Sequence, residues 1–413
     1  MASSTTTFPF PSTVGPPSFF TMSDRITPLK NEISPSTIRE RLRILALLFL
    51  RLGATAFGGP AAHIAMLRDE VVEKRRWFDD ANFLDLLGAT NLIPGPNSTE
   101  MAIHVGYLYA GWPGLLVSGA SFILPAAVIV GGVAWGYVEF GSTPQVQWIL
   151  YGIKPVAIAL IIKALLMLGK RAIQSFSLAV LGITVTMLYF LNVSELILLF
   201  GGGLVFLLIR SLTGSSSSQT AVVLLPLPLS ELLNQLRQSI DLSVLFLTFL
   251  KIGSVLYGSG YVLLAFLHSD FVSRLGWLTN QQLIDAVAVG QVTPGPVFTT
   301  ATFIGYLLAG FPGAILATTA IFLPSFLLVG LTNPLIPRLR RSAWAKHILD
   351  GVNVAALGLM AAVTIILSRE AFIDYLTPLI TMVALVMVFR TKVNASWLIL
   401  GGGLLGWIRF YIF

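Results

Sequence analysis

The fold of this chain is decided by two short stretches, NLIPGPNSTE at residues 91–100 and QVTPGPVFTT at residues 291–300. Each stretch lies in a long apolar run and contains Pro-Gly-Pro. Proline lacks a backbone N–H and disfavours helix in the residue before it, so a helix that reaches Pro-Gly-Pro ends there. Because the second proline can be the first residue of a new helix, each stretch predicts two half-helices that meet at a sharp break.

The composition around these stretches is typical of a helical membrane protein with many spans. The 413 residues are 55% hydrophobic and 11% charged, with a mean hydropathy of +0.83, whereas soluble domains carry about 25% charged residues. These values argue against a soluble enzyme, a nucleic-acid-binding domain and a disordered chain. The net charge of +7 is ordinary for basic membrane loops, and the lack of cysteine excludes disulfides and thiolate metal sites.

The apolar runs divide the chain into four parts. We expect a disordered Ser/Thr/Pro-rich tail over residues 1–38, a first membrane domain over 39–211, a linker over 212–238 and a second membrane domain over 239–413. Met22 is an alternative start of the chain, which would shorten the tail.

The two membrane domains are an internal repeat with an offset of about 200 residues. Residues 92–103 share 4 of 12 positions with residues 292–303, and residues 106–114 share 7 of 9 with residues 305–313. Chance similarity of two apolar helices does not account for so many identities, which include a doubled Pro-Gly-Pro. The second domain is therefore a copy of the first.

Basic residues in the loops predict that the two copies are inverted. Four Lys and Arg lie in residues 59–82 but one in 259–282, whereas none lies in 139–147 and four lie in 333–347. Basic loops prefer the cytoplasmic side, so this reversal indicates opposite orientations. An odd number of crossings between the first and third loops leaves the Pro-Gly-Pro run as a hairpin that dips in and returns. The expected fold is all-α and polytopic, with about five spans and one broken hairpin in each half.

The broken hairpins predict a binding site for an anion. The first N–H groups and the positive dipole end of the new helix point into the membrane, where they are tolerated only around a ligand, water or protein. Inverted repeats bring two such ends toward one site, although the motif can also simply kink a buried helix. The expected substrate-binding residues are Asn91, Pro94, Gly95, Pro96, Asn97, Ser98 and Thr99 in the first half, and Gln291, Pro294, Gly295, Pro296 and Thr299 in the second.

Two glycines after the first apolar run are further candidates for this site. Gly58 and Gly59 precede Pro60, and glycine lets a backbone approach a ligand closely. Close packing between helices is an equally good explanation of these glycines.

Four titratable residues in or near the apolar runs are candidates for charge or proton coupling, because charges are costly there. Glu100 and His104 lie four residues apart on one helix face and could relay a proton. Arg51 and Lys251 occupy the same place in the two halves and could supply the positive field that an oxyanion needs. The alternatives are a structural hydrogen-bonded pair for the first two and snorkelling to the lipid headgroups for the others.

Several motifs together resemble the chromate ion transporter (CHR) family in its long, two-domain form. The resemblance covers roughly residues 40–410. It implies a carrier of chromate in the plasma (inner) membrane, which generally exports the ion with the proton-motive force, with sulfate as an alternative substrate. The motifs are Phe57-Gly58-Gly59-Pro60-Ala61, Arg75-Arg76-Trp77, Leu92-Ile93-Pro94-Gly95-Pro96 and Ala110-Gly111-Trp112-Pro113-Gly114, with weaker copies in the second half.

The second half departs from these motifs at two places. Ser259-Gly260 stands where the first half has Gly59-Pro60, and Val297-Phe298 stands where it has Asn97-Ser98. We therefore expect the first half to coordinate the anion more directly than the second.

The leading functional hypothesis is secondary transport of a tetrahedral oxyanion, with one half rocking against the other. The residues alone leave chromate, sulfate, phosphate and carboxylates open, and an uptake carrier, a passive anion channel and an intramembrane enzyme are the alternatives. No GxxxxGK[ST] loop is present, which argues against direct ATP drive. The expected partners are chromate or sulfate, protons, the lipid bilayer and, as an open alternative, a second copy in a homodimer. We expect no nucleic acid, cofactor, metal or catalytic residue.

Overall fold

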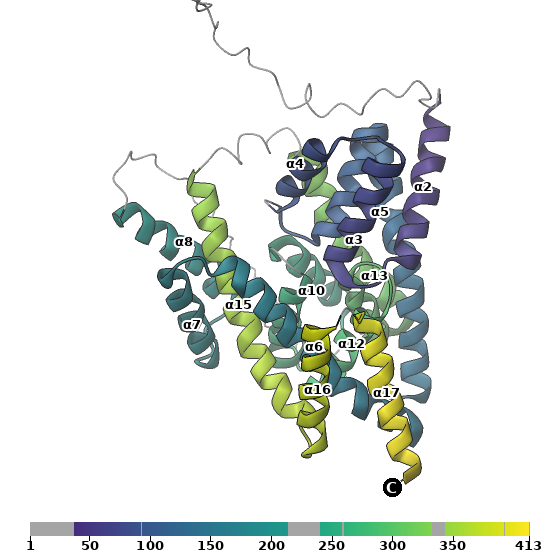
Figure 1. Cartoon of the computed structure of the whole chain (residues 1–413), viewed down its shortest axis with the longest axis vertical. Coiled ribbons are helices and arrows are strands. Elements are labelled where there is room, and N and C mark those ends of the chain that lie inside the picture. Colours follow the sequence, from purple (N-terminus) through teal and green to yellow (C-terminus); the bar gives the residue numbers. More distant parts are fainter. Residues whose placement is uncertain are drawn as a thin grey trace, which may run out of the picture.

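The structure is a computed structural model that describes residues 37–91, 93–213, 240–257, 260–332, 343–391 and 393–412. The regular elements among these residues are all helices (Figure 1). The predicted tail, the predicted linker and Met22 lie outside the described residues, apart from residues 37–38 and 212–213.

The helices of the second half repeat those of the first half in order. The first half contains α2 (Ile38–Thr55), α3 (Gly59–Arg68), the π-helix η1 (Asp69–Lys74), α4 (Asp80–Thr90), α5 (Asn97–Phe140), α6 (Pro144–Ala172), α7 (Phe176–Phe190) and α8 (Glu195–Thr213). The second half contains α10 (Leu242–Val255), η2 (Gly260–Val262), α11 (Leu263–Leu267), the π-helix η3 (His268–Arg274), α12 (Asn280–Val292), η4 (Val297–Thr299), α13 (Thr300–Thr332), α15 (Ala343–Ala371), α16 (Leu376–Arg390) and α17 (Ala395–Ile412).

Polar caps start corresponding helices at corresponding positions. At the start of α4, the Asp79 carboxylate accepts a hydrogen bond from the backbone N–H of Asn82 at 2.6 Å. At the start of α12, Thr279 and Gln282 form a reciprocal capping box. Such caps satisfy N–H groups that have no partner within the helix, so both broken hairpins begin at matching residues.

A second sharp turn interrupts α5 and α13 at the same place. Ala110-Gly111 leaves the helical conformation with φ values of −143° and 64°, and Ala309-Gly310 does so with −142° and 61°. The chain folds back at this turn, which brings Gly106 and Gly114 together although they are eight residues apart. They lie so close that a Cβ on Gly106 would overlap the backbone of Gly114. In the second half, the hydroxyls of Thr302 and Thr318 meet across the same turn at 2.7 Å.

The residues after these turns form a long arm in each half, residues 111–140 of α5 and 311–332 of α13. The two long arms run antiparallel, because Trp112 packs on Gly330 whereas Gly119 packs on Phe326. Since the arms correspond to each other in the repeat, the two halves are inverted relative to one another. The predicted inverted halves, each with a broken hairpin, are confirmed.

In the described ranges, five helices are long and apolar enough to cross a membrane: Asn97–Phe140, Pro144–Ala172, Val297–Leu331, Lys346–Ala371 and Ala395–Ile412. Some of the helices at the other expected spans are shorter. Helix α7 has 15 residues and α10 has 14, against about 20 for a typical span.

Six helices from both halves form one group, which we call the frame. Helix α6 packs on α16 and α17 of the other half, α15 packs on α7 and α8, and α6 also packs on α15. Thr381 of α16 donates a hydrogen bond to the Pro155 carbonyl of α6 at 3.0 Å, and Thr186 of α7 does the same to Gly358 of α15 at 3.0 Å. The frame thus interlocks the halves, and its small and hydroxyl residues are typical of helix packing in membranes.

The remaining helices, α2–α5 and α10–α13, form a second group, which we call the hairpin unit. Its three largest contacts join α2 to α5, α5 to α13, and α13 to α10. The boundary between frame and hairpin unit therefore differs from the boundary between the sequence halves. Because each group contains helices of both halves, rigid rocking of one half against the other, as expected from the sequence, does not fit this packing.

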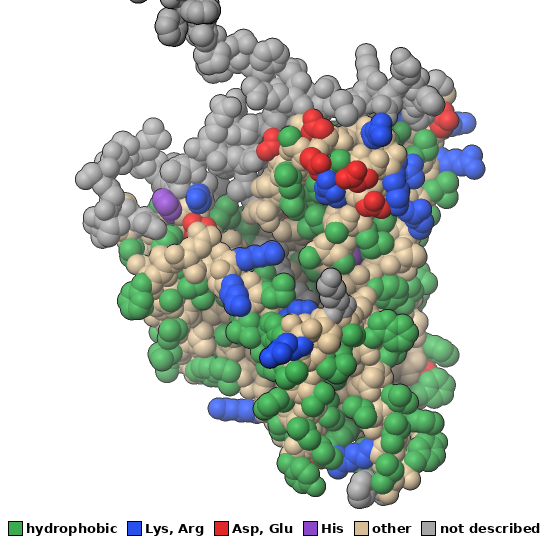
Figure 2. Space-filling view, in the orientation of Figure 1, with side chains coloured by type: hydrophobic (Ala, Val, Ile, Leu, Met, Phe, Trp, Pro, Cys, Tyr) green, Lys and Arg blue, Asp and Glu red, His purple; other side chains and the backbone are tan. Residues whose placement is uncertain are grey.

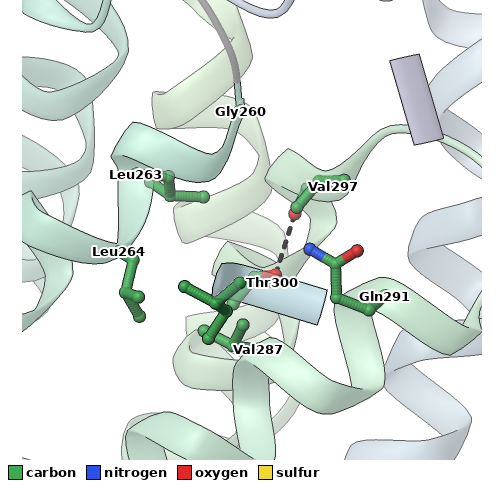
Figure 3. A pocket seen from close by; sticks show the side chains of 8 residues that line it. Gly260, Leu263, Leu264, Val287, Gln291, Val297 and Thr300 are labelled. Atoms are coloured by element: carbon green, nitrogen blue, oxygen red, sulfur yellow. Dashed lines mark hydrogen bonds between the residues drawn. The ribbon is translucent and has the colours of Figure 1, made fainter. Parts of the chain in front are cut away.

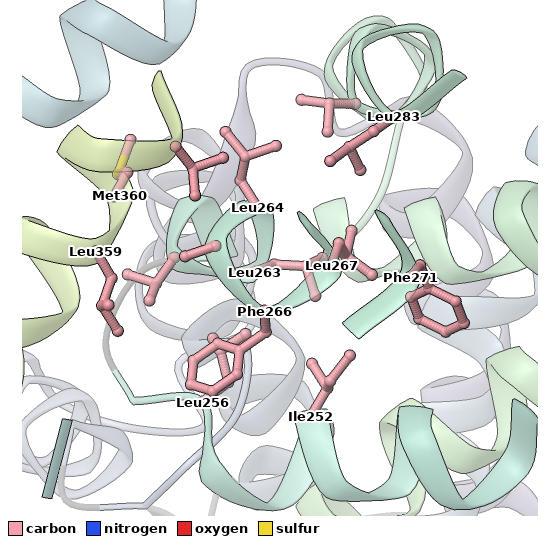
Figure 4. Packing of buried hydrophobic residues seen from close by; sticks show 14 of the residues in the cluster. Ile252, Leu256, Leu263, Leu264, Phe266, Leu267, Phe271, Leu283, Leu359 and Met360 are labelled. Atoms are coloured by element: carbon pink, nitrogen blue, oxygen red, sulfur yellow. The ribbon is translucent and has the colours of Figure 1, made fainter. Parts of the chain in front are cut away.

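The hairpin unit meets the frame unequally at its two ends. On the second-half side, α12 packs on α6, α15 and α17, and the apolar side chains of α11 lie against Leu359 and Met360 of α15 (Figure 4). On the first-half side, α4 has extensive contacts among the described residues with α5 alone. Figure 2 shows charged side chains gathered over the α3–α4 end and a hollow beside it. The structure is therefore closed on the second-half side and more open on the first-half side.

Candidate functional site

The two Pro-Gly-Pro corners lie buried at the centre of the hairpin unit, and each is bound to the other half. The Gly95 N–H donates to the Leu256 carbonyl at 2.8 Å, and the Gly295 N–H donates to the Ala56 carbonyl at 3.0 Å. Ala56 and Leu256 are the residues that end α2 and α10. The structure thus brings both corners and the ends of both first helices into one arrangement.

Both corner glycines are required by conformation and by space. Gly95 has a φ of 144° and Gly295 a φ of 88°, a region that side chains with a Cβ rarely adopt. A Cβ on Gly95 would overlap the Glu100 carboxyl and the Ser325 hydroxyl, whereas a Cβ on Gly295 would overlap Ala126. The corner of each half is therefore covered by the long arm of the other half.

The start of α5 presents backbone donors inside the protein. The N–H groups of Thr99 and Glu100 both donate to the Pro96 carbonyl, at 2.8 and 3.0 Å. The N–H groups of Asn97 and Ser98 have no hydrogen-bond partner among the described residues. Because this helix end carries a positive partial charge, it favours an anionic ligand.

Polar side chains around this helix start are buried and lack partners. Within the described part of the chain, no hydrogen bond reaches the Asn97 Oδ1, the Thr99 hydroxyl, either Glu100 oxygen, either His104 ring nitrogen or the Ser325 hydroxyl. Glu100, His104 and Ser325 have no exposed surface, and Ser98 is 3% exposed. Buried polar groups normally find a partner, so this cluster indicates a site for a ligand, water or protons.

Asn91 lies at the edge of this cluster and positions one of its members. The exposed Asn91 side chain accepts a hydrogen bond from the Asn97 amide at 2.7 Å and donates to the Leu87 carbonyl at 3.0 Å. Asn91 is thereby bound to Asn97, which lies in the same short segment as Pro94, Gly95, Pro96, Ser98 and Thr99.

The second half builds an apolar version of the same place. The Thr299 hydroxyl donates to the Pro296 carbonyl and the Thr300 hydroxyl to the Val297 carbonyl, each at 2.8 Å. A cavity of about 10 Å³, close to the size of one water, lies beside them (Figure 3). Its lining is mostly apolar, and the buried Gln291 amide nitrogen has no partner among the described residues.

Comparing the two halves position by position explains the difference. Leu263, Gln291, Val297 and Thr300 line the second-half cavity. The residues at the same positions of the first half are His63, Asn91, Asn97 and Glu100. The polar and titratable groups are thus concentrated at the first-half corner.

Gly58 and Gly59 form the turn between α2 and α3. Their φ values of 107° and 77° are in the left-handed region, which explains why glycine stands there. One helical turn later, the buried His63 ring contacts the Ala56 carbonyl at 2.9 Å, so Ala56 is bound by both His63 and Gly295. A direct contact of Gly58 and Gly59 with substrate stays a prediction.

Arg51 and Lys251 lie in two equivalent ion clusters next to the π-helices. Arg51 pairs with Glu70 on η1, and Lys251 pairs with Asp270 on η3 at 2.6 Å. The Arg51 side chain is 58% exposed and that of Lys251 is 15% exposed. Burial alone would raise the pKa of Glu70, but hydrogen bonds from Lys74 and Arg51 outweigh it and hold this pKa below its usual range. The structure therefore places both basic residues in ion pairs and does not bring them to the Pro-Gly-Pro corners.

A buried polar link that joins the frame to the hairpin unit was not predicted from the sequence. Lys154 of α6 lies 3.5 Å from Asp285 of α12 and donates to Gln281 at 2.5 Å. Tyr137 of α5 also donates to Asp285, at 2.9 Å. The repeat contained a signal for this link, because Asp85 and Asp285 match at an offset of 200, an unusual pair of acids for apolar runs.

Ser325 is the other site residue that sequence reasoning missed. It follows Pro324 in the second half, where the first half has Ala126 after Pro125. A polar residue at one copy of a repeated apolar position was the available signal. Among the described residues, no group of three or more His, Cys, Asp or Glu could hold a metal ion.

Comparisons with known proteins match both halves of the chain. The family described as "Chromate transporter" matches residues 44–207 and again residues 243–407. The chromate transport protein of Cupriavidus metallidurans is 31% identical over 377 residues, 89% of this chain and 93% of that protein. The probable chromate transport protein of Synechococcus elongatus is 33% identical over 84% of this chain and 89% of its own length.

A third relative, the chromate transport protein of Pseudomonas aeruginosa, is 31% identical over 88% of this chain and 91% of its own length. No solved structure matches the chain. The apolar helices and these relatives make the protein a multi-pass protein of the plasma membrane. With two matches that cover most of its length, one for each inverted half, the chain belongs to the chromate transporter family.

Proposed function

We propose that the protein is a secondary transporter that exports chromate across the plasma membrane and is driven by the proton-motive force. Sulfate, which has the same charge and tetrahedral shape, is the alternative cargo. The observation that carries this proposal is the buried start of α5, where N–H groups and hydroxyls have no hydrogen-bond partner in the part of the chain that the structure describes. The names of the relatives supply chromate as the oxyanion.

The chemistry of the first-half corner suits a tetrahedral oxyanion. The N–H groups of Asn97 and Ser98 and the hydroxyls of Ser98, Thr99 and Ser325 are donors that come from two segments, the start of α5 and the long arm of α13. An oxyanion presents four oxygens in different directions, so donors around a corner fit it better than a flat apolar solute. Holding an oxyanion requires hydrogen-bond donors and does not require a catalytic acid or base.

Transport requires that the site open alternately to the two sides. We infer that the hairpin unit tilts against the frame, because these two groups share fewer contacts than each has within itself. In the present state α12 is docked on the frame and α4 is not. Inverted symmetry then makes the opposite state the one in which α4 is docked and α12 is released.

The membrane potential supports export as the direction. Moving one charge through 100 mV is worth about 2.3 kcal/mol, so a dianion leaving a cell with a negative interior gains about twice that amount. The closed second-half side favours a carrier over a passive anion channel, which would need a continuous path. Sulfate or oxyanion uptake is the other carrier function with the same site, and a homodimer stays a prediction.

Flux of labelled chromate in proteoliposomes tests the proposal. We expect chromate to move in response to an imposed potential or pH gradient, and unlabelled chromate inside the vesicles to accelerate exchange. Asn97→Ala should abolish this flux while the protein remains in the membrane. Absence of chromate and sulfate flux under every gradient would contradict the proposal, and flux without exchange would indicate a channel.

Growth on chromate decides the direction in cells. Expression should make a sensitive host more resistant at both low and high sulfate, because export lowers internal chromate. Sensitisation that high sulfate relieves would instead support the uptake carrier.

A further inference from the structure

Glu100 is a buried carboxyl group that has neither a hydrogen-bond partner nor an ion-pair partner among the described residues. It has no exposed surface, and neither carboxyl oxygen has a hydrogen-bond partner among the described residues. Its Oε1 and the Ser325 hydroxyl both lie over the Cα of Gly95, where a Cβ would overlap them. The carboxyl thus lies at the seam between the first-half corner and the second-half long arm.

The helices on either side of Glu100 carry no charge that neutralises it. On its own helix, His104 lies one turn further on and has no partner among the described residues. From the end of α10, Tyr257 lies close enough to be influenced by the Glu100 charge. Residues 300–332 of α13 contain no Lys, Arg, His, Asp or Glu, and η4 contains none either.

The charged and titratable residues of the other neighbouring helices make contacts away from Glu100. On α3, His63 contacts the Ala56 carbonyl, and Arg68 pairs with Asp80 of α4. On α2, Arg51 pairs with Glu70. The second acid of α4, Asp85, is exposed, whereas Glu100 is fully buried. Within the described residues, an ionised Glu100 would therefore face no cation and accept no hydrogen bond, which is costly in a buried site.

We propose that Glu100 is the proton-binding residue of the transport site and that one proton and one oxyanion dianion are carried together in the same direction. This inference rests on the proposed function of the first-half corner. When the carboxyl is protonated, its O–H can donate to an oxyanion held at the adjacent N–H groups. When the O–H bond is broken and the proton leaves, the carboxylate repels the dianion across a few ångströms of protein.

Thermodynamic linkage determines how the binding of the proton and the binding of the dianion affect each other. If the proton raises the affinity for the dianion, the dianion raises the affinity for the proton by the same factor. Loading takes both from one side, and release frees both on the other side. The charge moved in each cycle is then −1 instead of −2. The membrane-potential part of the proton-motive force therefore still drives export, whereas an alkaline interior opposes it, because one proton leaves with each anion.

The first experiment uses the wild-type protein in detergent and needs no variant. Sulfate or chromate added to the protein in weakly buffered solution should cause proton uptake that approaches one proton for each anion bound. The anion affinity should fall by about tenfold for each pH unit once the free protein has lost its Glu100 proton. Binding of the anion without proton uptake at any pH would overturn the inference.

The second experiment measures steady-state sulfate ratios in proteoliposomes. With the potential clamped at zero, a gradient of one pH unit should make wild-type protein accumulate sulfate about tenfold on the alkaline side. With equal pH, a potential of about 59 mV should sustain a tenfold ratio in wild type. In Glu100→Gln, which keeps a donor but binds no proton, the pH gradient should sustain no ratio and the same potential should sustain about a hundredfold ratio.

Two variants separate Glu100 from its neighbours. Glu100→Asp keeps a titratable group and should keep the response to the pH gradient. His104→Gln tests the neighbouring titratable group: loss of the response in His104→Gln together with its retention in Glu100→Gln would overturn the inference in favour of His104. A wild-type protein that moves neither sulfate nor chromate would contradict the proposed function, whereas flux with an unchanged −2 charge would contradict only the role of Glu100.

Discussion

The backbone N–H of Gly95 donates a hydrogen bond to the carbonyl of Leu256, 2.8 Å away, across the boundary between the two halves. Gly295 repeats the bond to Ala56 at 3.0 Å, so each bond is the counterpart of the other at an offset of 200 residues. These two bonds tie each corner to the first helix of the opposite half. The corners are consequently held as one body inside the hairpin unit.

Gly95→Ala should abolish transport. The new methyl group would require a left-handed φ of 144° and would overlap the Glu100 carboxyl and the Ser325 hydroxyl. The strain is of order 1–3 kcal/mol and falls on the site itself. Chromate flux in proteoliposomes and the amount of protein in the membrane fraction measure the two effects separately.

Gly131→Ala is the matched control for that variant. Gly131 lies on the long arm of α5 in ordinary helical conformation, and a Cβ there would meet nothing within 4 Å. The chromate flux of Gly131→Ala should equal that of wild type. Equal loss of flux in both variants would contradict the special role of the corner.

Single cysteines at Asn91 and Gln291 should differ strongly in reactivity. The two positions correspond in the repeat, but Asn91 is exposed whereas Gln291 is 8% exposed. The natural chain has no cysteine, so there is no background labelling. A water-soluble maleimide should label Asn91→Cys rapidly and Gln291→Cys slowly. Equal labelling rates would contradict a state that is open on one side only.

The link between Lys154 and Asp285 should hold the second-half side closed. Removing one partner of a buried ion pair costs about 3–5 kcal/mol, because the other charge is left unpaired. Lys154→Ala should therefore increase the labelling of Gln291→Cys several-fold. A double-mutant cycle with Asp285→Ala, read by thermal unfolding in detergent, should give a coupling of about 1–3 kcal/mol. Additive effects would mean that the two residues do not act together.

Lys251→Ala should destabilise the protein more than Arg51→Ala. Lys251 and its partner Asp270 are 15% and 0% exposed, whereas Arg51 is 58% exposed and Glu70 keeps a second partner in Lys74. We expect a loss of about 3 kcal/mol for the buried pair and below about 1 kcal/mol for the exposed one. If Arg51 instead attracts the oxyanion by its positive charge, Arg51→Ala should lower chromate flux and leave the thermal stability unchanged.

Asp374 should stabilise the frame at neutral pH and lose this effect in acid. It accepts hydrogen bonds from Tyr151 at 2.7 Å, from the Thr377 N–H at 3.0 Å and from Arg409 at 3.0 Å. Burial alone would raise the pKa of Asp374, but these hydrogen bonds outweigh it and leave the pKa below its usual value. Because the pKa of Asp374 is lower in the folded protein than in the unfolded chain, its carboxylate stabilises the folded state at pH values above the unfolded-chain pKa of about 3.9. This stabilisation is lost as the pH falls through the pKa of the folded protein.

The measurement for Asp374 is thermal unfolding of Asp374→Asn and wild type in detergent across pH. The variant should be less stable by about 1 kcal/mol at pH 7. The difference should shrink toward zero near the acid limit, where wild type has also lost the charge. A difference that stays constant with pH would show that the hydrogen bonds act without the charge.

Local patterns predicted much of this fold. The Pro-Gly-Pro motifs predicted the breaks, because a missing N–H and a steric clash act within a few residues. The loop charges predicted the inverted halves, since Lys and Arg bias the side on which each loop lies. The second turn at Ala110-Gly111 was not anticipated as a fold-back, although Pro113 follows it at the start of the long arm.

The order of amino acids is enough to predict the helical membrane class, the duplicated halves and the residues at the two corners. The packing of the helices was needed to show that Arg51 meets Glu70, that Ser325 of the second half covers the first-half corner, and that Lys154 links the frame to the hairpin unit. These contacts mostly join segments far apart in the chain. Their partners depend on how whole helices pack, and no local pattern carries that information.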